Sequence, residues 1–209
     1  MASKSHKRLR IFAGPNGSGK STITKVVLDH VHLGVYVNAD ELKIILQREG
    51  RLDLSAYRVN LDHEWFIAKF RKSSLASKID DVEITLSCIS FDGNQIILKE
   101  GYEVEDYFVS YITSYIWEEL LKTSNKFTVE TVMSHPSKLD FMRQAQEAGF
   151  KVYLYFVSLA DPELNKHRVQ TRVSQGGHLV DENKIEQRYY RTMNNLYEAL
   201  KITDEAYLL

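Results

Sequence analysis

Residues 14–21 read Gly-Pro-Asn-Gly-Ser-Gly-Lys-Ser and match the pattern Gly-x-x-x-x-Gly-Lys-Ser/Thr in full. Glycines let a backbone curl so that successive N–H groups point at phosphate oxygens. Lys20 would place its ammonium on the β- and γ-phosphates of a nucleotide, and the Ser21 hydroxyl would ligate Mg²⁺. The ATP site expected from this pattern comprises Gly14, Pro15, Asn16, Gly17, Ser18, Gly19, Lys20, Ser21 and Thr22.

Two carboxylates follow short apolar runs that predict strands: Asp40 comes after residues 35–37, and Glu130 after residues 127–129. In open α/β sheets, ligands bind beyond the carboxyl ends of strands, so we expect both acids to face the phosphate loop. There, a carboxylate can accept a hydroxyl proton or hold Mg²⁺ through water. Plainer interpretations are a helix cap for Asp40 and a surface charge for Glu130. The occurrence of both acids with a phosphate loop favours function.

Basic residues gather late in the chain, at His167, Arg168, Arg172, His178 and Arg188. Arg168 and Arg172 are four residues apart and share one helical face. The helix that begins at Asp161-Pro162 must stop at Gly176-Gly177, and the next begins near Asp181. We interpret residues 161–192 as a lid-like segment whose arginines neutralise charge on transferring phosphate oxygens. The alternative is a solvated helix face.

The elements around these residues predict an α/β fold of the P-loop NTPase type, a parallel sheet flanked by helices. Expected strands lie at 9–13, 35–37, 127–129 and 152–157, and expected helices at 20–30, 137–148 and 181–200, with another after Asp40. We interpret residues 1–209 as a single domain. Residues 51–125 form an insertion of helix, hairpin and helix on the substrate side. Within it, one helical face carries Tyr57, Leu61 and Trp65, residues 82–88 alternate as a strand, and Asp92-Gly93 marks the hairpin turn. The aromatic stripe from Val104 to Tyr115 predicts a buried helix.

Composition excludes several classes of protein. The 27 Lys and Arg residues balance 28 Asp and Glu, a formal charge of −1, which gives no whole-molecule attraction to nucleic acid or anionic membrane. The single Cys88 forms no intramolecular disulfide and anchors no cysteine-rich zinc site. No stretch approaches the ~20 apolar residues that span a bilayer. These observations predict a soluble, cytoplasmic protein.

Taken together, the motifs resemble those of the zeta toxin family of P-loop kinases. The resemblance covers residues 9–48 and 126–192 and rests on four stretches: Gly14–Thr22, Asn38-Ala-Asp-Glu-Leu42, Phe127-Thr-Val-Glu-Thr131, and Arg168–His178 with the later Arg188-Tyr189. It implies an ATP- and Mg²⁺-dependent kinase in which Asp40 takes the proton from a sugar hydroxyl. It also implies that Glu130, with Thr131, His178 and Arg188, binds the substrate. Family toxins phosphorylate UDP-N-acetylglucosamine, and antitoxin partners block their nucleotide site.

Three hypotheses follow from the sequence. The first is a small-molecule kinase in which Lys20, Asp40, Arg168 and Arg172 are catalytic, with ATP and Mg²⁺ as cofactors. The second is a regulatory module in which bound nucleotide controls partner binding without any acceptor. The third is a polynucleotide end kinase, which would need a basic cleft. A GTPase switch is disfavoured because the nearest match to the guanine motif Asn-Lys-x-Asp, at residues 183–186, ends in Glu.

Overall fold

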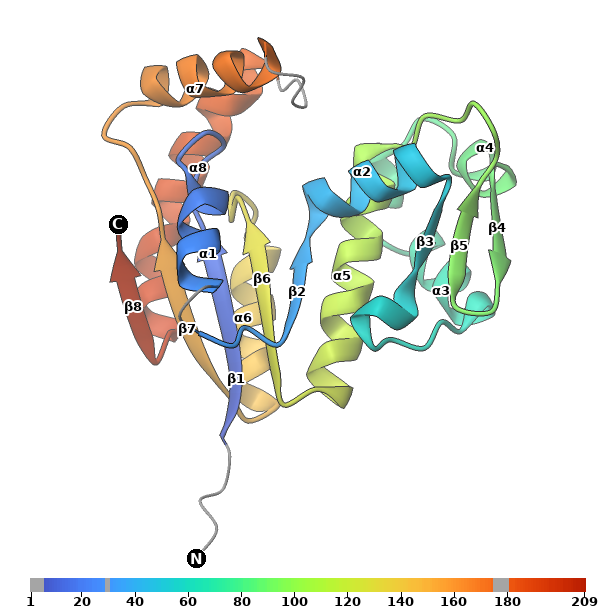
Figure 1. The fold of residues 1–209 in the computed structure, drawn as a ribbon, viewed down its shortest axis with the longest axis horizontal. Helices are drawn as coiled ribbons and strands as arrows, with labels where there is room; N and C mark the ends of the chain where they lie inside the picture. Colours follow the sequence, from blue (N-terminus) through green and yellow to red (C-terminus); the bar gives the residue numbers. More distant parts are fainter. Residues whose placement is uncertain (1–5, 29–30, 175–180) are drawn as a thin grey trace, which may run out of the picture. The chain divides into compact units, whose positions relative to one another are not determined.

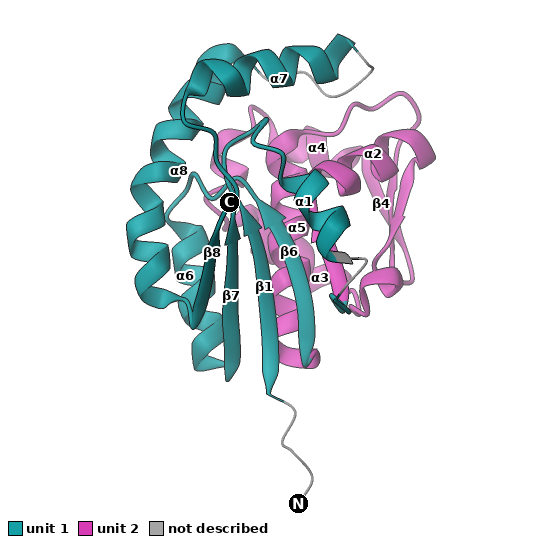
Figure 2. Cartoon of the chain, turned by 60° about the vertical axis from the view of Figure 1, so that its left-hand side comes forward, with its two compact units in different colours: residues 1–34, 125–209 teal, residues 35–124 magenta. Residues whose placement is uncertain are grey.

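The computed structural model describes residues 6–28, 31–174 and 181–209. The chain divides into two compact units, and Figure 2 colours them separately: residues 1–34 with 125–209 form unit 1, and residues 35–124 form unit 2. The phosphate loop belongs to unit 1, whereas Asp40 belongs to unit 2. Each unit has its own buried core. In the described residues, no helix is long and apolar enough to cross a membrane.

Unit 1 is built on parallel strands, β1 (Lys7–Ala13), β6 (Lys126–Thr131), β7 (Phe150–Phe156) and β8 (Glu205–Leu208). Ile11 at the centre of β1 pairs with Val129 on one side and with Leu154 on the other. The full sheet has five strands in the order β2-β6-β1-β7-β8, where β2 is Val35–Asn38. This is the α/β fold with a parallel sheet that the motif pattern predicts.

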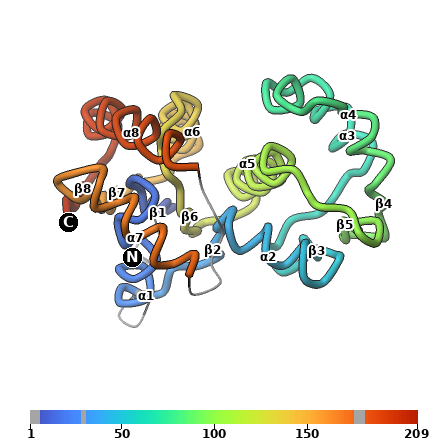
Figure 3. The backbone as a smooth tube through the Cα atoms, turned by 90° about the horizontal axis from the view of Figure 1, so that it is seen from above, coloured from blue at the N-terminus to red at the C-terminus, as the bar shows by residue number. Residues whose placement is uncertain are grey.

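Helices cover both faces of the unit 1 sheet. Helix α1 (Lys20–Leu28) lies on one face, while α6 (Ser137–Glu147) and α8 (Glu182–Ile202) lie on the other (Figure 3). Helix α7 (Pro162–Ser174) crosses above the carboxyl ends of the strands (Figure 1). Because successive strand residues alternate between faces, Leu9 and Ile11 point to the α6 side, and Arg10 and Phe12 to the α1 side. Each of these helices was predicted from the sequence, α7 from its start at Asp161-Pro162, whereas β8 was not.

Unit 2 combines a small antiparallel sheet with helices. Its elements after β2 are α2 (Ala39–Glu49), β3 (Arg51–Asp53), α3 (His63–Arg71), α4 (Val82–Ser87), β4 (Ile89–Asp92), β5 (Gln95–Leu98) and α5 (Asp106–Thr123), with 3-10 turns at Leu54–Tyr57 and Ala76–Lys78. The sheet order is β3-β5-β4. The core is aromatic: Phe66 of α3 makes edge contacts with Phe108, Tyr111 and Tyr115 of α5. The predicted buried stripe of α5 is therefore confirmed.

Two predictions in unit 2 were wrong. Residues 82–87 form helix α4, with Cys88 as its C-cap, rather than a strand, because the Asp81 side chain caps the helix by accepting the N–H of Ile84. Six residues are too few to distinguish the two-residue period of a strand from the 3.6-residue period of a helix. In this segment the cap favours the helix. Tyr57, Leu61 and Trp65 also do not share a helix, since Tyr57 ends a 3-10 turn and α3 begins only at His63. The hairpin at Asp92-Gly93 is confirmed by the pairing of β4 with β5.

Candidate phosphate-binding site

The glycine loop links β1 to α1, and it is close-packed against the segments that surround it. Gly14, Gly17 and Gly19 have φ angles of +147°, +77° and +100°, values that side-chain-bearing residues rarely adopt. A Cβ added at Gly14 would lie 1.9 Å from the carbonyl oxygen of Val157, and one at Gly17 would lie 2.5 Å from that of Asn165. Backbone alone fits at these two positions. The loop therefore has the glycine cradle that a bound phosphate chain requires.

Lys20 opens α1 and lies across this loop. Its side chain is 8% exposed, and the ammonium donates hydrogen bonds of 2.9 Å to the carbonyl oxygens of Gly14 and Pro15. The first turn of a helix leaves N–H groups without intrahelical partners, and it carries the positive end of the helix dipole. The lysine charge and the positive end of the helix dipole therefore converge at one end of α1, an arrangement that attracts anions.

Glu130, at the end of β6, lies directly beside the start of α1. Glu130 is 8% exposed, and its carboxylate accepts a 2.9 Å hydrogen bond from the Ser21 hydroxyl and a 3.3 Å bond from the Thr24 hydroxyl. Register explains the placement, because Glu130 pairs with Phe12 of β1 on the face that α1 covers. The structure thus brings the predicted residues Glu130 and Ser21 together.

The side chains of Ser21, Thr24 and Glu130 form a corner beside the loop, and their oxygen atoms are suitable ligands for magnesium. Hydroxyl and carboxylate oxygens are the hard ligands that Mg²⁺ takes, and Mg²⁺ is usually held by one or two protein groups together with substrate phosphates. In the described parts of the chain, no three His, Cys, Asp or Glu side chains cluster into a metal site. A metal at Ser21 and Glu130 would therefore depend on a nucleotide for its remaining ligands.

Helix α7 covers the outer side of the glycine loop. Asn165 is fully buried and donates a 2.6 Å hydrogen bond to the carbonyl oxygen of Asn16. Arg168, three residues further along, has its guanidinium 3.5 Å from the carbonyl oxygen of Ser18, at the outer limit of a hydrogen bond. Arg172 lies one turn further on and is exposed. Of the two predicted arginines, the structure places Arg168 against the loop.

The other predicted residues of unit 1 are Thr131, Arg188 and His178. Thr131 ends β6, and its hydroxyl accepts the N–H of Met133. Arg188 is half-buried on α8. His178 lies outside the described residues.

Asp40 occupies the second position of α2 in unit 2. The cap of α2 is Asn38, whose side chain accepts the Asp40 N–H at 2.9 Å. The carboxylate of Asp40 is therefore not the helix cap. Asp40 is exposed, and none of the described residues bonds to its side chain. This leaves the carboxylate available for chemistry, and its role as a base stays a prediction.

Two residues at the loop were missed by reasoning from the sequence, Asn165 and Thr24. Asn165 precedes Val169 by four positions, so it falls on the buried face of α7, where a polar residue is unusual. That position was the available signal. Thr24 carried none, since its contact with Glu130 joins residues 106 positions apart.

Two ties between side chains hold α7 to α8. Lys166 bonds to Glu186 at 2.7 Å and to Glu163 within its own helix, and these contacts raise the pKa of the Lys166 ammonium above its usual value. Gln170 donates to Glu182 at 2.5 Å. The arginine-bearing helix is thus braced along its length by α8.

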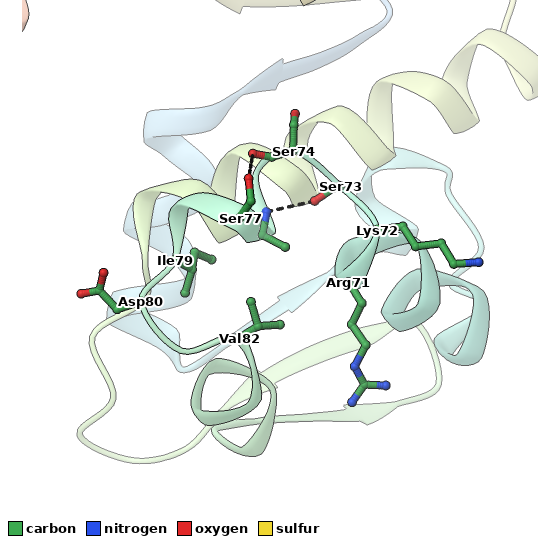
Figure 4. Close-up of a pocket in the computed structure, with 9 residues that line it drawn as sticks. Arg71, Lys72, Ser73, Ser74, Ser77, Ile79, Asp80 and Val82 are labelled. Atoms are coloured by element: carbon green, nitrogen blue, oxygen red, sulfur yellow. Dashed lines mark hydrogen bonds between the residues drawn. The ribbon is translucent and has the colours of Figure 1, made fainter.

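A surface pocket in unit 2 contains none of the predicted site residues. It lies between the end of α3 and the start of α4 (Figure 4). The guanidinium of Arg71 donates through two nitrogens to the carboxylate of Glu83. The side chains of Lys72 and Asp80 point away from each other (Figure 4). Its polar groups do not converge on one point, so the glycine loop remains the candidate site.

Solved structures with the same fold include two at a TM-score above 0.5. The Pnkp1/Rnl/Hen1 RNA repair complex aligns over 94% of this chain and 47% of its own, with a TM-score of 0.55 and 14% identity. The PezAT chromosomal toxin–antitoxin system of Streptococcus pneumoniae aligns over 100% and 70%, with a TM-score of 0.53 and 13% identity. At such identities these likenesses establish the α/β fold alone.

Sequence comparison adds a relative and a family. A protein of Haemophilus influenzae (strain Rd), described as uncharacterized, is 35% identical over 63 residues, 30% of this chain and 45% of the relative. The chain therefore spans less than half of the length of that relative. The family model described as zeta toxin matches residues 98–205. This match begins within the segment 51–125 and does not include the glycine loop. The family model and the loop geometry are therefore independent observations. Since the match covers more than half of the 209 residues, the chain belongs to the zeta toxin family.

Proposed function

We propose that the protein is an ATP-dependent kinase that transfers the γ-phosphoryl group of ATP to a hydroxyl of a small molecule. The observation that carries this proposal is the corner formed by Ser21, Thr24 and Glu130 beside the glycine loop, with hydrogen bonds of 2.9 and 3.3 Å. It combines an anion-binding cradle with oxygen ligands suited to magnesium. Membership of the zeta toxin family supports the same chemistry.

The proposed step is a displacement at the γ-phosphorus. The acceptor oxygen forms a bond to phosphorus, and the bond from phosphorus to the β–γ bridging oxygen breaks, which releases ADP. The hydroxyl proton passes to the carboxylate of Asp40. Lys20 supplies positive charge to the β- and γ-phosphates, while Arg168, Arg172 and His178 neutralise the transferring oxygens.

Magnesium would be held by the Ser21 hydroxyl, with the carboxylate of Glu130 behind it. When bound, the ion would neutralise phosphate charge. The residues at the carboxyl end of β6, Glu130 and Thr131, together with Arg188, would also contribute to binding the acceptor.

For the acceptor we propose a nucleotide sugar, as the resemblance to the family implies, with UDP-N-acetylglucosamine as the first compound to test. We also propose an antitoxin partner, because one structure similar to this chain belongs to a toxin–antitoxin system. The need for ATP and a nucleotide sugar is consistent with the cytoplasmic location predicted from the sequence.

The test is mass spectrometry of a panel of nucleotide sugars incubated with the protein and ATP·Mg²⁺. The expected result is a mass increase of one phosphate on UDP-N-acetylglucosamine or a related sugar, and no such product with Lys20→Ala. A panel that also contains a 5′-hydroxyl oligonucleotide separates the alternatives. Phosphate on the oligonucleotide alone would replace the proposal with an end kinase. ATP binding without any phosphorylated product would indicate the regulatory module.

A further inference from the structure

Asn165 is a buried polar residue at the contact between α7 and the glycine loop. It is 0% exposed, and its Nδ2 donates to the carbonyl oxygen of Asn16 at 2.6 Å. Among the described residues, its Oδ1 has no hydrogen-bond partner. An unpaired amide oxygen opposes burial, so an apolar residue of similar size would suit a purely structural role at least as well.

The backbone of Asn165 also lies against the crest of the loop. A Cβ at Gly17 would come within 2.5 Å of the Asn165 carbonyl oxygen and 3.1 Å of a methyl carbon of Val169. Helix and loop are thus in direct contact, with no room for a side chain between them. The hydrogen bond from the side-chain amide of Asn165 to the carbonyl oxygen of Asn16 sets how far along the loop the helix lies. Apolar contact alone does not specify this position.

This placement has a consequence for Arg168, which shares the helix. Three residues along a helix bring a side chain back to nearly the same side, about 4.5 Å further along the axis. Arg168 accordingly meets the next part of the loop: its Nη1 lies 3.5 Å from the Ser18 carbonyl oxygen and 3.5 Å from the Cβ position of Gly19. A shift of α7 by a fraction of a turn would remove this contact.

We propose that Asn165 is a positioning residue, which fixes α7 on the glycine loop and thereby aims Arg168 at the phosphoryl group in transfer. This inference rests on the proposed kinase function. Asn165 itself contacts neither nucleotide nor acceptor, and its effect on turnover passes through Arg168.

The experiment is a double-mutant cycle read out as ATP turnover. Asn165→Leu keeps the number and branching of the side-chain heavy atoms and removes the donor. Asn165→Asp keeps the shape and replaces the donor with an acceptor oxygen. Both variants are expected to lower kcat roughly tenfold or more, within the range of coupling between contacting residues. The Kd for ATP·Mg²⁺ should change less than about threefold, since the loop itself keeps its residues. Thr171→Ala, an exposed position on the same helix, is the matched control and is expected to retain wild-type turnover.

The decisive measurement compares the effect of Asn165→Leu on kcat in proteins that already carry a second substitution. In Arg168→Ala protein, Asn165→Leu should change kcat by less than about twofold, because the residue that it positions is gone. In Arg172→Ala protein, its full effect should remain. Multiplicative effects of Asn165→Leu and Arg168→Ala would overturn the inference, and so would wild-type kcat in both Asn165 variants. Failure of both variants to fold would also overturn it, since Asn165 would then be needed for the fold itself.

Failure of the proposed function has a different signature. If the wild-type protein neither binds ATP·Mg²⁺ in calorimetry nor turns it over, the kinase assignment fails before any variant is compared. If the wild type is active and Lys20→Ala is not, the Asn165 cycle tests the positioning role alone.

Discussion

Glu130→Gln separates charge from shape at the candidate metal corner. In the structure, Ser21 donates to one carboxylate oxygen at 2.9 Å and Thr24 approaches the other at 3.3 Å. The Thr24 hydroxyl can also donate to the carbonyl oxygen of Lys20 at 3.0 Å. A glutamine could therefore accept a hydrogen bond from Ser21 through Oε1 and donate one to Thr24 through Nε2, while the Thr24 hydroxyl donates to the carbonyl oxygen of Lys20. Each of these groups keeps a partner.

The expected change in stability is small. One charge-assisted bond becomes neutral, a loss of about 1 kcal/mol, and removing a buried charge offsets part of it. For a chain of this length, 1 kcal/mol corresponds to a Tm shift of about 2–4 °C. Turnover should fall about 100-fold or more, because the negative charge that would support the metal at Ser21 is gone.

The assay is a coupled measurement of ADP release at increasing Mg²⁺ concentration, together with thermal unfolding. If Glu130 supports the metal, the Mg²⁺ concentration for half-maximal turnover should rise about tenfold or more. If the carboxylate acts on the acceptor instead, the KM of the acceptor should rise with an unchanged Mg²⁺ requirement. Glu198→Gln makes the same chemical change at a surface ion pair with Lys201 and should leave both values as in wild type. Turnover within threefold of wild type for Glu130→Gln would refute the reasoning.

Three further predictions follow. Lys20→Ala should abolish ATP-dependent phosphorylation, because it removes the cation beside the loop carbonyls, and a radiolabelled transfer assay checks this. Asp40→Asn should keep the Kd for ATP within about threefold in calorimetry while kcat falls about 10²-fold or more; undiminished kcat would remove the base assignment. Tyr111→Phe should lower the free energy of unfolding by about 1 kcal/mol in urea, because the Tyr111 hydroxyl donates a 2.6 Å hydrogen bond to the Phe66 carbonyl oxygen in the core of unit 2. A midpoint equal to that of wild type would contradict this last prediction.

The sheet of unit 1 was predictable because its signals are local. Glycine spacing identifies the loop at 14–19, and a cap acid before Pro162 identifies the start of α7. Gly149, with a φ angle of +82°, ends the α6 segment as its position predicts. In contrast, β8 follows α8 after only a short link and is exposed at all four positions, so no buried periodicity marks it. Because β8 is defined by its pairing with β7, it can be recognised from the tertiary structure and not from the sequence.

The chemistry of the site was predictable by residue type, and its organisation was not. Glu130 was expected near the loop because strands end there, yet its bond to Ser21 depends on the register of β6 against β1. Asn165 was missed because its role depends on contact with Gly17, a residue 148 positions earlier. Periodicity places such a residue on the inner face of a helix; only tertiary structure says what lies opposite it.

The contacts of α7 bear on the lid interpretation of residues 161–192. Its first half is attached to the glycine loop through Asn165, and the helix is tied to α8 through Lys166 and Gln170. Helix α8 in turn holds the segment after Glu130, since Thr192 donates to the Val132 carbonyl oxygen and Asn195 to that of Met133. Displacing α7 as a whole would break its contacts with both the glycine loop and α8. In this structure Arg168 already lies beside the Ser18 carbonyl oxygen, and the interpretation of residues 161–192 as a lid-like segment stays a prediction.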